Sequence, residues 1–163
     1  MKIKKLTLII SWVLLGITVH AQQTDFSGTW EFEDQQVISG DLSSDVSPTK
    51  MKITQTSDEI SIEKMTSAGN GDVITNETVA FGGKPFQTTT PSGGKKWITI
   101  KWSPDRKSFS ETTDLFSPSD GSKLEYKVTD TWSRDEGKLV LVRRDENFII
   151  GKVQESKLFY GRH

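Results

Sequence analysis

From Phe26 onward, apolar and polar side chains alternate along the chain with a period of two, and no long stretch has the period of a helix. In the first such segment Phe26, Gly28, Trp30 and Phe32 share one parity, while Ser, Thr and Glu side chains occupy the other. A period of two places successive side chains on opposite faces of a strand, so one face is apolar and the other is solvated. The pattern predicts an all-β chain of antiparallel strands.

The alternation recurs in about ten segments, which are separated by short connections rich in Gly, Asp, Asn and Ser. Short connections of this kind indicate an antiparallel meander, which can either form two packed sheets or close into one barrel. Residues 34–48 form the longest segment without alternation and are expected to be a loop or lid. The expected strands cover residues 26–33, 50–55, 59–63, 73–81, 96–102, 107–116, 123–133, 138–144, 148–153 and 157–162.

The N-terminus has a different character, because Lys2, Lys4 and Lys5 precede an apolar run over residues 6–19. Such a run, followed by a small residue at position 21, is typical of a secretory signal peptide cleaved after Ala21. An uncleaved membrane anchor is the alternative, but a spanning helix needs about 20 apolar residues. The sequence therefore predicts an exported, soluble protein, periplasmic or extracellular, with a single domain over residues 22–163.

Composition excludes several classes of function. Without the first 21 residues, which hold three lysines and no acid, 18 basic side chains face 22 acidic ones, so no basic surface for nucleic acid is expected. The chain has no cysteine, and its two histidines are His20 and His163. Thiol catalysis, cysteine metal sites and a histidine-assisted serine nucleophile are therefore not expected, and the core must be stabilised by packing alone.

Residues 25–30, Asp-Phe-Ser-Gly-Thr-Trp, resemble the Gly-x-Trp motif that opens the first strand of lipocalins and their calycin relatives. The whole chain after residue 21 also resembles exported, lipocalin-like bacterial proteins that begin with Phe-Ser-Gly-Thr-Trp. The resemblance implies an up-and-down barrel of about eight to ten strands, closed at one end by Gly28 and Trp30 with Arg162 packed across the indole ring. Trp30 is alternatively an ordinary aromatic side chain of a β core.

If Trp30 faces the interior, the inward-facing positions can be predicted for the later strands as well. These positions include charged residues. Isolated ions are costly in a dry interior, so these side chains are expected to be paired or to border a wet cavity. One interpretation is a ligand pocket with a charged mouth and aromatic walls. The alternative places the charges at strand ends, in solvent or in ion pairs. The candidate mouth residues are Glu77, Glu111, Asp130 and Arg143, and the candidate walls are Trp102, Tyr126 and Trp132.

The sequence leaves two classes of function open. The first is a barrel that binds a small apolar or amphipathic ligand without a cofactor. The second is a non-catalytic structural or protein-interaction module with a filled core, which contacts its partner through residues 34–48. An interior cavity of several hundred Å³ would distinguish the first from the second.

Catalysis and membrane insertion are not expected from these residues. A carboxylate pair of the glycosidase type requires two acids at a defined separation, which one sequence does not provide. No catalytic residue and no metal ligand is assigned. The outward parity carries Lys50, Lys52, Glu59 and Glu63, which a lipid-facing barrel would not tolerate. The oligomeric state stays open.

Overall fold

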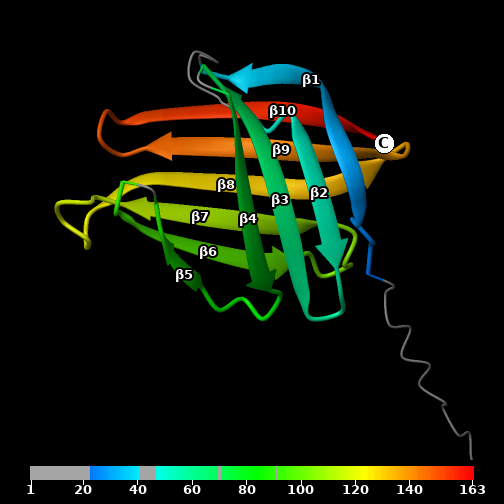
Figure 1. The fold of residues 1–163 in the computed structure, drawn as a ribbon, viewed down its shortest axis with the longest axis horizontal. Helices are drawn as coiled ribbons and strands as arrows, with labels where there is room; N and C mark the ends of the chain where they lie inside the picture. Colours follow the sequence, from blue (N-terminus) through cyan, green and yellow to red (C-terminus); the bar gives the residue numbers. More distant parts are fainter. Residues whose placement is uncertain (1–22, 41–46, 70, 91) are drawn as a thin grey trace, which may run out of the picture.

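The computed structural model describes residues 23–40, 47–69, 71–90 and 92–163, so the expected signal peptide and its cleavage site lie outside the described residues. The described part of the chain is a single antiparallel sheet of ten strands (Figure 1). No helix that is long and apolar enough to cross a membrane occurs in that part. The strands are β1 Gly28–Ser39, β2 Lys50–Gln55, β3 Glu59–Ala68, β4 Gly71–Ala80, β5 Phe86–Thr89, β6 Lys95–Trp102, β7 Phe109–Phe116, β8 Leu124–Asp135, β9 Lys138–Asn147 and β10 Lys152–Arg162.

The sheet curls into a nearly closed barrel. Its order is β4-β3-β2-β1-β10-β9-β8-β7-β6-β5, so every strand pairs with its neighbour in sequence except at β4 and β5, and β1 pairs with β10. In Figure 1, β2, β3 and β4 cross over the wall formed by β6 to β10. The up-and-down meander with a closing β1–β10 ladder confirms the predicted all-β barrel architecture.

Alternating strand direction gives the barrel two distinct ends. The β2–β3, β4–β5, β6–β7 and β8–β9 connections meet at one end with the C-terminus, and we call this the closed end. The last residues of β1, β3, β5, β7 and β9 and the first residues of β2, β4, β6, β8 and β10 lie at the other end, which we call the open end.

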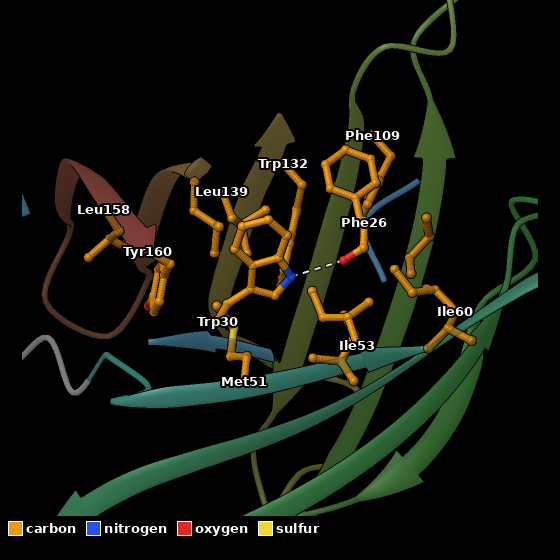
Figure 2. Close-up of a cluster of buried hydrophobic side chains, with 14 of the residues drawn as sticks. Phe26, Trp30, Met51, Ile53, Ile60, Phe109, Trp132, Leu139, Leu158 and Tyr160 are labelled. Carbon is orange, nitrogen blue, oxygen red and sulfur yellow. Dashed lines mark hydrogen bonds between the residues drawn. The ribbon is translucent and has the colours of Figure 1, made fainter. Parts of the chain in front are cut away.

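A fully buried aromatic and aliphatic core fills the closed end (Figure 2). The indole Nε1 of Trp30 donates a hydrogen bond of 2.9 Å to the carbonyl oxygen of Phe26, which fixes the N-terminal segment across the barrel. Phe109 stacks on Trp132 with ring centroids 5.4 Å apart, and its edge meets the ring of Phe26 at 4.9 Å. Side chains from both walls therefore meet, and this half of the barrel is packed by its own residues.

Gly28, Trp30 and Arg162 lie together at this end, where the resemblance to lipocalins places them. Trp30 and Arg162 are directly paired across β1 and β10, and the guanidinium carbon of Arg162 lies 5.9 Å from the centroid of the indole ring. A Cβ atom at Gly28, whose φ is +143°, would lie 3.3 Å from Arg162 Nε. Arg134 covers the same ring at 5.5 Å, so two cations flank Trp30.

Three sequence expectations are wrong in detail. Residues 34–39, expected to begin a loop, continue β1, because a bulge after Phe32 lets this segment pair with β10 alone. Residues 148–151, expected to begin a strand, form the β9–β10 turn, in which Asn147 Oδ1 accepts hydrogen bonds from the amides of Ile149 and Ile150. Residues 152–162 are then one strand, and the short edge strand β5 was not expected.

The closed-end core predicts a large stability cost for truncating Trp30. Replacing Trp30 by Ala removes a buried indole and its hydrogen bond, and we expect the free energy of unfolding to fall by about 3–5 kcal/mol. Trp30→Phe, which keeps a ring but loses the hydrogen bond, is expected to cost about 1–3 kcal/mol. Urea unfolding measures both, with the exposed Phe148→Ala as control. A cost below 1 kcal/mol for Trp30→Ala would contradict this role of Trp30.

Candidate functional site

Polar side chains form a layer inside the barrel directly next to the aromatic core. The strand register shows how the interior changes from apolar to polar. One row of inward-facing side chains across β6 to β10 is apolar, and the next row toward the open end is mostly polar. The first row is Trp102, Phe109, Trp132, Leu141 and Leu158, and the second row is Ile100, Glu111, Asp130, Arg143 and Ser156. The interior therefore changes from apolar to polar between two adjacent inward-facing positions of these strands.

Asp130 and Arg143 form a bidentate ion pair in this layer. They are direct partners on β8 and β9, with Arg143 Nε 2.8 Å from Asp130 Oδ1 and Arg143 Nη2 2.9 Å from Asp130 Oδ2. Both side chains are nearly inaccessible to solvent. Burial would raise the pKa of Asp130, but the charges of Arg143 and Lys64 outweigh it and hold this pKa below its ordinary value. The carboxylate therefore stays ionised in the folded protein.

Lys64 crosses the interior from β3 to reach Glu111 on β7, on the opposite wall. Its Nζ atom lies 2.9 Å from Glu111 Oε1 and 5.7 Å from the centroid of the Trp132 ring. Burial would lower the pKa of Lys64, but the negative charges of Glu111 and Asp130 hold this pKa above its ordinary value. The ammonium thus stays charged between two carboxylates and an indole face.

A third ion pair crosses the seam at which the sheet is open. Lys96 on β6 donates a hydrogen bond to Glu77 on β4, although β4 and β5 share no backbone ladder at this seam. Nearer the closed end, the ring of Phe81 packs against Trp102 at 5.1 Å between centroids. Side chains therefore connect the edges where backbone hydrogen bonds do not. We call the six side chains Lys64, Glu77, Lys96, Glu111, Asp130 and Arg143 the charge layer.

The charge layer retains unused hydrogen-bonding groups at its border with the core. Among the described residues, Trp102 Nε1 in the core has no hydrogen-bond partner, and neither do the buried atoms Glu111 Oε2 and Trp132 Nε1 at this border. The two residues are diagonal neighbours, because Glu111 pairs with Asp130 and Phe109 pairs with Trp132 along β7 and β8. Both also approach the same Lys64 ammonium. Buried polar atoms without partners are costly, which makes this spot a candidate binding position.

Between the charge layer and the open end, apolar side chains point inward but remain accessible. Val37 on β1 and Val73 on β4 are each 50% exposed, and Tyr126 on β8 is 39% exposed. Strand register shows that all three side chains point inward. Val37 pairs with Ser156, Val73 has the same parity as Val79 on β4, and Tyr126 has the same parity as Asp130 on β8. Inward-facing side chains of this size stay exposed only where nothing packs over them. The inner surface at the open end is therefore accessible to solvent.

The structure separates the predicted pocket residues into three levels. Trp102 and Trp132 belong to the closed-end core, with Trp132 bordering the charge layer. Glu77, Glu111, Asp130 and Arg143 lie in the charge layer, not at the mouth as expected, because each is drawn inward by an oppositely charged partner. Tyr126 lies at the open end.

Two members of the charge layer were missed in the sequence. Lys64 has the parity of Ile60 and Ile62, and Lys96 has the parity of Ile98. Following these two strands to their ends would have placed both lysines inside the barrel. Their carboxylate partners, in contrast, lie 47 and 19 residues away in sequence and depend on how the sheet closes.

A separate hollow of about 270 Å³ lies on the outer surface of β6, β7 and β8. Its lining residues have the parity opposite to that of the core, so it does not communicate with the barrel interior through this wall. It is polar and carries no apolar side chain, which makes it a poor site for an amphipathic ligand. The lining residues are Thr99, Lys101, Ser110, Thr112 and Lys127.

The buried Asp130–Arg143 pair predicts strong coupling between substitutions. Asp130→Leu or Arg143→Met alone leaves one unpaired buried ion, and we expect each to lower the free energy of unfolding by about 3–5 kcal/mol. The double variant removes both charges and should be more stable than the sum of the single effects predicts, with a coupling energy of about 2–3 kcal/mol.

Denaturant unfolding of the wild type and the three variants provides this coupling energy. The exposed pair Lys138 and Glu33, also in salt-bridge contact at 2.6 Å, is the control, and its coupling should be much weaker because solvent screens both charges. Additive effects at Asp130 and Arg143 would contradict a desolvated pair.

Comparison with known proteins shows a shared fold at low sequence identity. No protein-family model matches the sequence, and no curated protein sequence matches it. The zebrafish ileal bile acid-binding protein, solved in complex with cholic acid, superposes with a TM-score of 0.50 at 14% identity, covering 85% of this chain and 98% of that one. A secretory abundant heat soluble protein from Ramazzottius varieornatus has a TM-score of 0.55 at 10% identity, covering 88% and 98% of the respective chains. The chain therefore has the up-and-down, calycin-like β-barrel fold that its sequence predicts.

Proposed function

We propose that this chain is an exported protein that binds one small amphipathic molecule in the open half of its barrel. The observation that carries the proposal is the accessible, inward-facing apolar surface of Val37, Val73 and Tyr126, which lies above a buried polar floor. Sites for small ligands combine apolar walls with a few fixed polar groups in this way. No cofactor is needed, because the barrel itself supplies both kinds of surface.

The layering of the interior sets the orientation of the ligand. The closed half is filled by side chains such as Trp30, Phe109 and Tyr160, which are buried, so a ligand has no room there. A polar headgroup is stabilised at the charge layer, and an apolar tail extends toward the open end. The tail then covers apolar surface that is exposed to water in the free protein, which provides the driving force for binding.

The rim of the open end supports access by an apolar molecule. Most of the large apolar side chains that are exposed on the described surface lie near this end rather than the closed one. They include the tip of the β9–β10 hairpin, where Phe148, Ile149 and Ile150 are 49%, 53% and 62% exposed. An apolar rim lowers the cost of transferring a hydrophobic tail from water into the barrel.

The shared fold gives further support. The zebrafish protein described above was solved with cholic acid, so a barrel of this architecture can hold an amphipathic molecule. The residues that would contact a ligand here are those of this chain, namely Glu111, Trp132 and the apolar side chains of the open half. Export is proposed from the signal-peptide pattern of residues 1–21, with cleavage after Ala21.

Adjacent threonines on β7 provide a matched test of ligand binding. Thr113 faces the interior between Ile98 and Val128, whereas Thr112 faces outward between Thr99 and Thr129. Thr113→Trp places an indole in the open half, and we expect it to weaken binding of the neutral fluorophore Nile red by at least about tenfold, or about 1.4 kcal/mol. Thr112→Trp, the same change on the outer face, should leave the affinity unchanged within about twofold.

Fluorescence titration measures both affinities, and far-ultraviolet circular dichroism checks that the variants are folded. No binding of Nile red or other amphipathic probes to the wild type would favour the filled structural or interaction module over a binding barrel. Equal binding by the wild type and Thr113→Trp would place the site outside the open half.

A further inference from the structure

The cations of the charge layer are already paired with carboxylates of the protein. Lys64 binds Glu111, Lys96 binds Glu77, and Arg143 binds Asp130 through two hydrogen bonds. On the same face of β9, Asp145 lies one inward-facing position closer to the open end and accepts a hydrogen bond from Gln154. The inward-facing groups of this region therefore carry at least as much negative charge as positive charge.

This balance is unfavourable for an anionic headgroup. A ligand carboxylate placed at the charge layer would have to compete with Glu111 or Asp130 for a cation, and the displaced carboxylate would be buried without a partner. It would also add a negative charge in a region of low dielectric constant that already contains Glu111, Asp130 and Asp145. The charge layer thus disfavours fatty-acid-like ligands, although it contains three cations.

The unused hydrogen-bonding groups specify a different headgroup. Glu111 Oε2 is a carboxylate acceptor and needs a donor, whereas Trp132 Nε1 is a donor and needs an acceptor. A carboxylate would satisfy Trp132 but repel Glu111. An ammonium would satisfy Glu111 but not Trp132, and it would approach the Lys64 ammonium that contacts both residues. A hydroxyl group donates and accepts at once and carries no charge.

We propose that the barrel selects amphipathic ligands with an uncharged hydroxyl headgroup, which donates a hydrogen bond to Glu111 Oε2 and accepts one from Trp132 Nε1. This inference rests on the proposed function and adds the chemical class of the ligand. Lys64 is a positioning residue in this site, because its ammonium holds Glu111 Oε1 and leaves Oε2 for the ligand. The aliphatic tail extends from this point toward the open end, past Thr113 and Val128.

Three amphipaths with the same tail test the selectivity: decanol, decanoate and decylamine, each used to displace Nile red from the full domain at neutral pH. We expect decanol to bind at least about tenfold more tightly than decanoate, because a hydrogen bond to a charged acceptor is gained in one case and an ion pair is broken in the other. Decanoate binding as tightly as decanol would overturn the inference while leaving the proposed function intact. Failure of all three to bind would instead overturn the proposed function.

Substitution of Glu111 should shift the preference toward decanoate. Glu111→Gln keeps the size of the side chain but removes the charge that neutralises Lys64, so the ammonium becomes available to a ligand carboxylate. We expect the ratio of decanol to decanoate affinity to change by at least about tenfold in favour of decanoate. Asp114→Asn is the matched control, because Asp114 lies on the outer face of β7 opposite Lys127, and it should leave the ratio unchanged. An unchanged ratio in Glu111→Gln would also overturn the inference.

A second variant tests the donor if Glu111→Gln does not fold. Trp132→Phe keeps an aromatic ring beside Phe109 and Lys64 but removes Nε1. We expect it to weaken decanol binding by about tenfold, with a smaller effect on Nile red. In the wild type, the indole NH resonance of Trp132, assigned from its loss in this variant, should shift when decanol binds. A resonance that does not move on saturation with decanol would contradict the proposed hydrogen bond.

Discussion

Ionised side chains inside a barrel must be paired, and in this barrel the paired side chains form the layer that separates the buried core from the exposed apolar side chains of the open end. Lys64 reaches from β3 to Glu111 on β7, Lys96 from β6 to Glu77 on β4, and Arg143 from β9 to Asp130 on β8. Two of these pairs connect walls that share no backbone ladder. The charges therefore fix how the β2–β4 wall faces the β6–β10 wall, at the seam where the sheet is open.

The closed end supplies the stability that allows the other end to remain open. Without cysteine, the chain has no disulfide to connect its strands, and the packing of Phe26, Trp30, Phe109 and Trp132 replaces it. A protein that packed its whole interior in this way would bury Val37, Val73 and Tyr126 as well. Their exposure, directly beyond a buried polar layer, provides the apolar surface that the proposed ligand would cover.

The sequence predicted the architecture better than the site. Alternation and the position of Trp30 were enough to assign the inward parity, and this parity correctly placed Glu77, Glu111, Asp130 and Arg143 inside the barrel. Their depth was not predictable, because it depends on the Lys64 and Lys96 side chains that reach them from other strands. The expected total of about ten strands agrees with the structure only because the missed strand β5 offsets residues 148–162, which were expected to contain two strands and contain one.

Local chemistry explains the remaining differences. The apolar residues 148–150 have strand composition, but the side chain of Asn147 binds the amides of the next turn, and Gly151 has a φ of +66° that ends it. Residues 34–39 begin with three polar side chains, yet β10 offers this segment a free edge to pair with. In both places a nearby hydrogen-bonding partner, not hydrophobicity, decides the structure.

The most direct test of ligand binding in the open half is a methyl NMR titration of the protein with decanol. Valine methyl groups report on both faces of the barrel: Val37, Val73 and Val128 face inward in the open half, whereas Val142 and Val153 face outward. Binding inside the open half predicts saturable shifts of the three inward-facing valines, with little change at the two outward-facing ones. Shifts confined to Val142 and Val153, or no saturable shift at any of the five, would contradict the account.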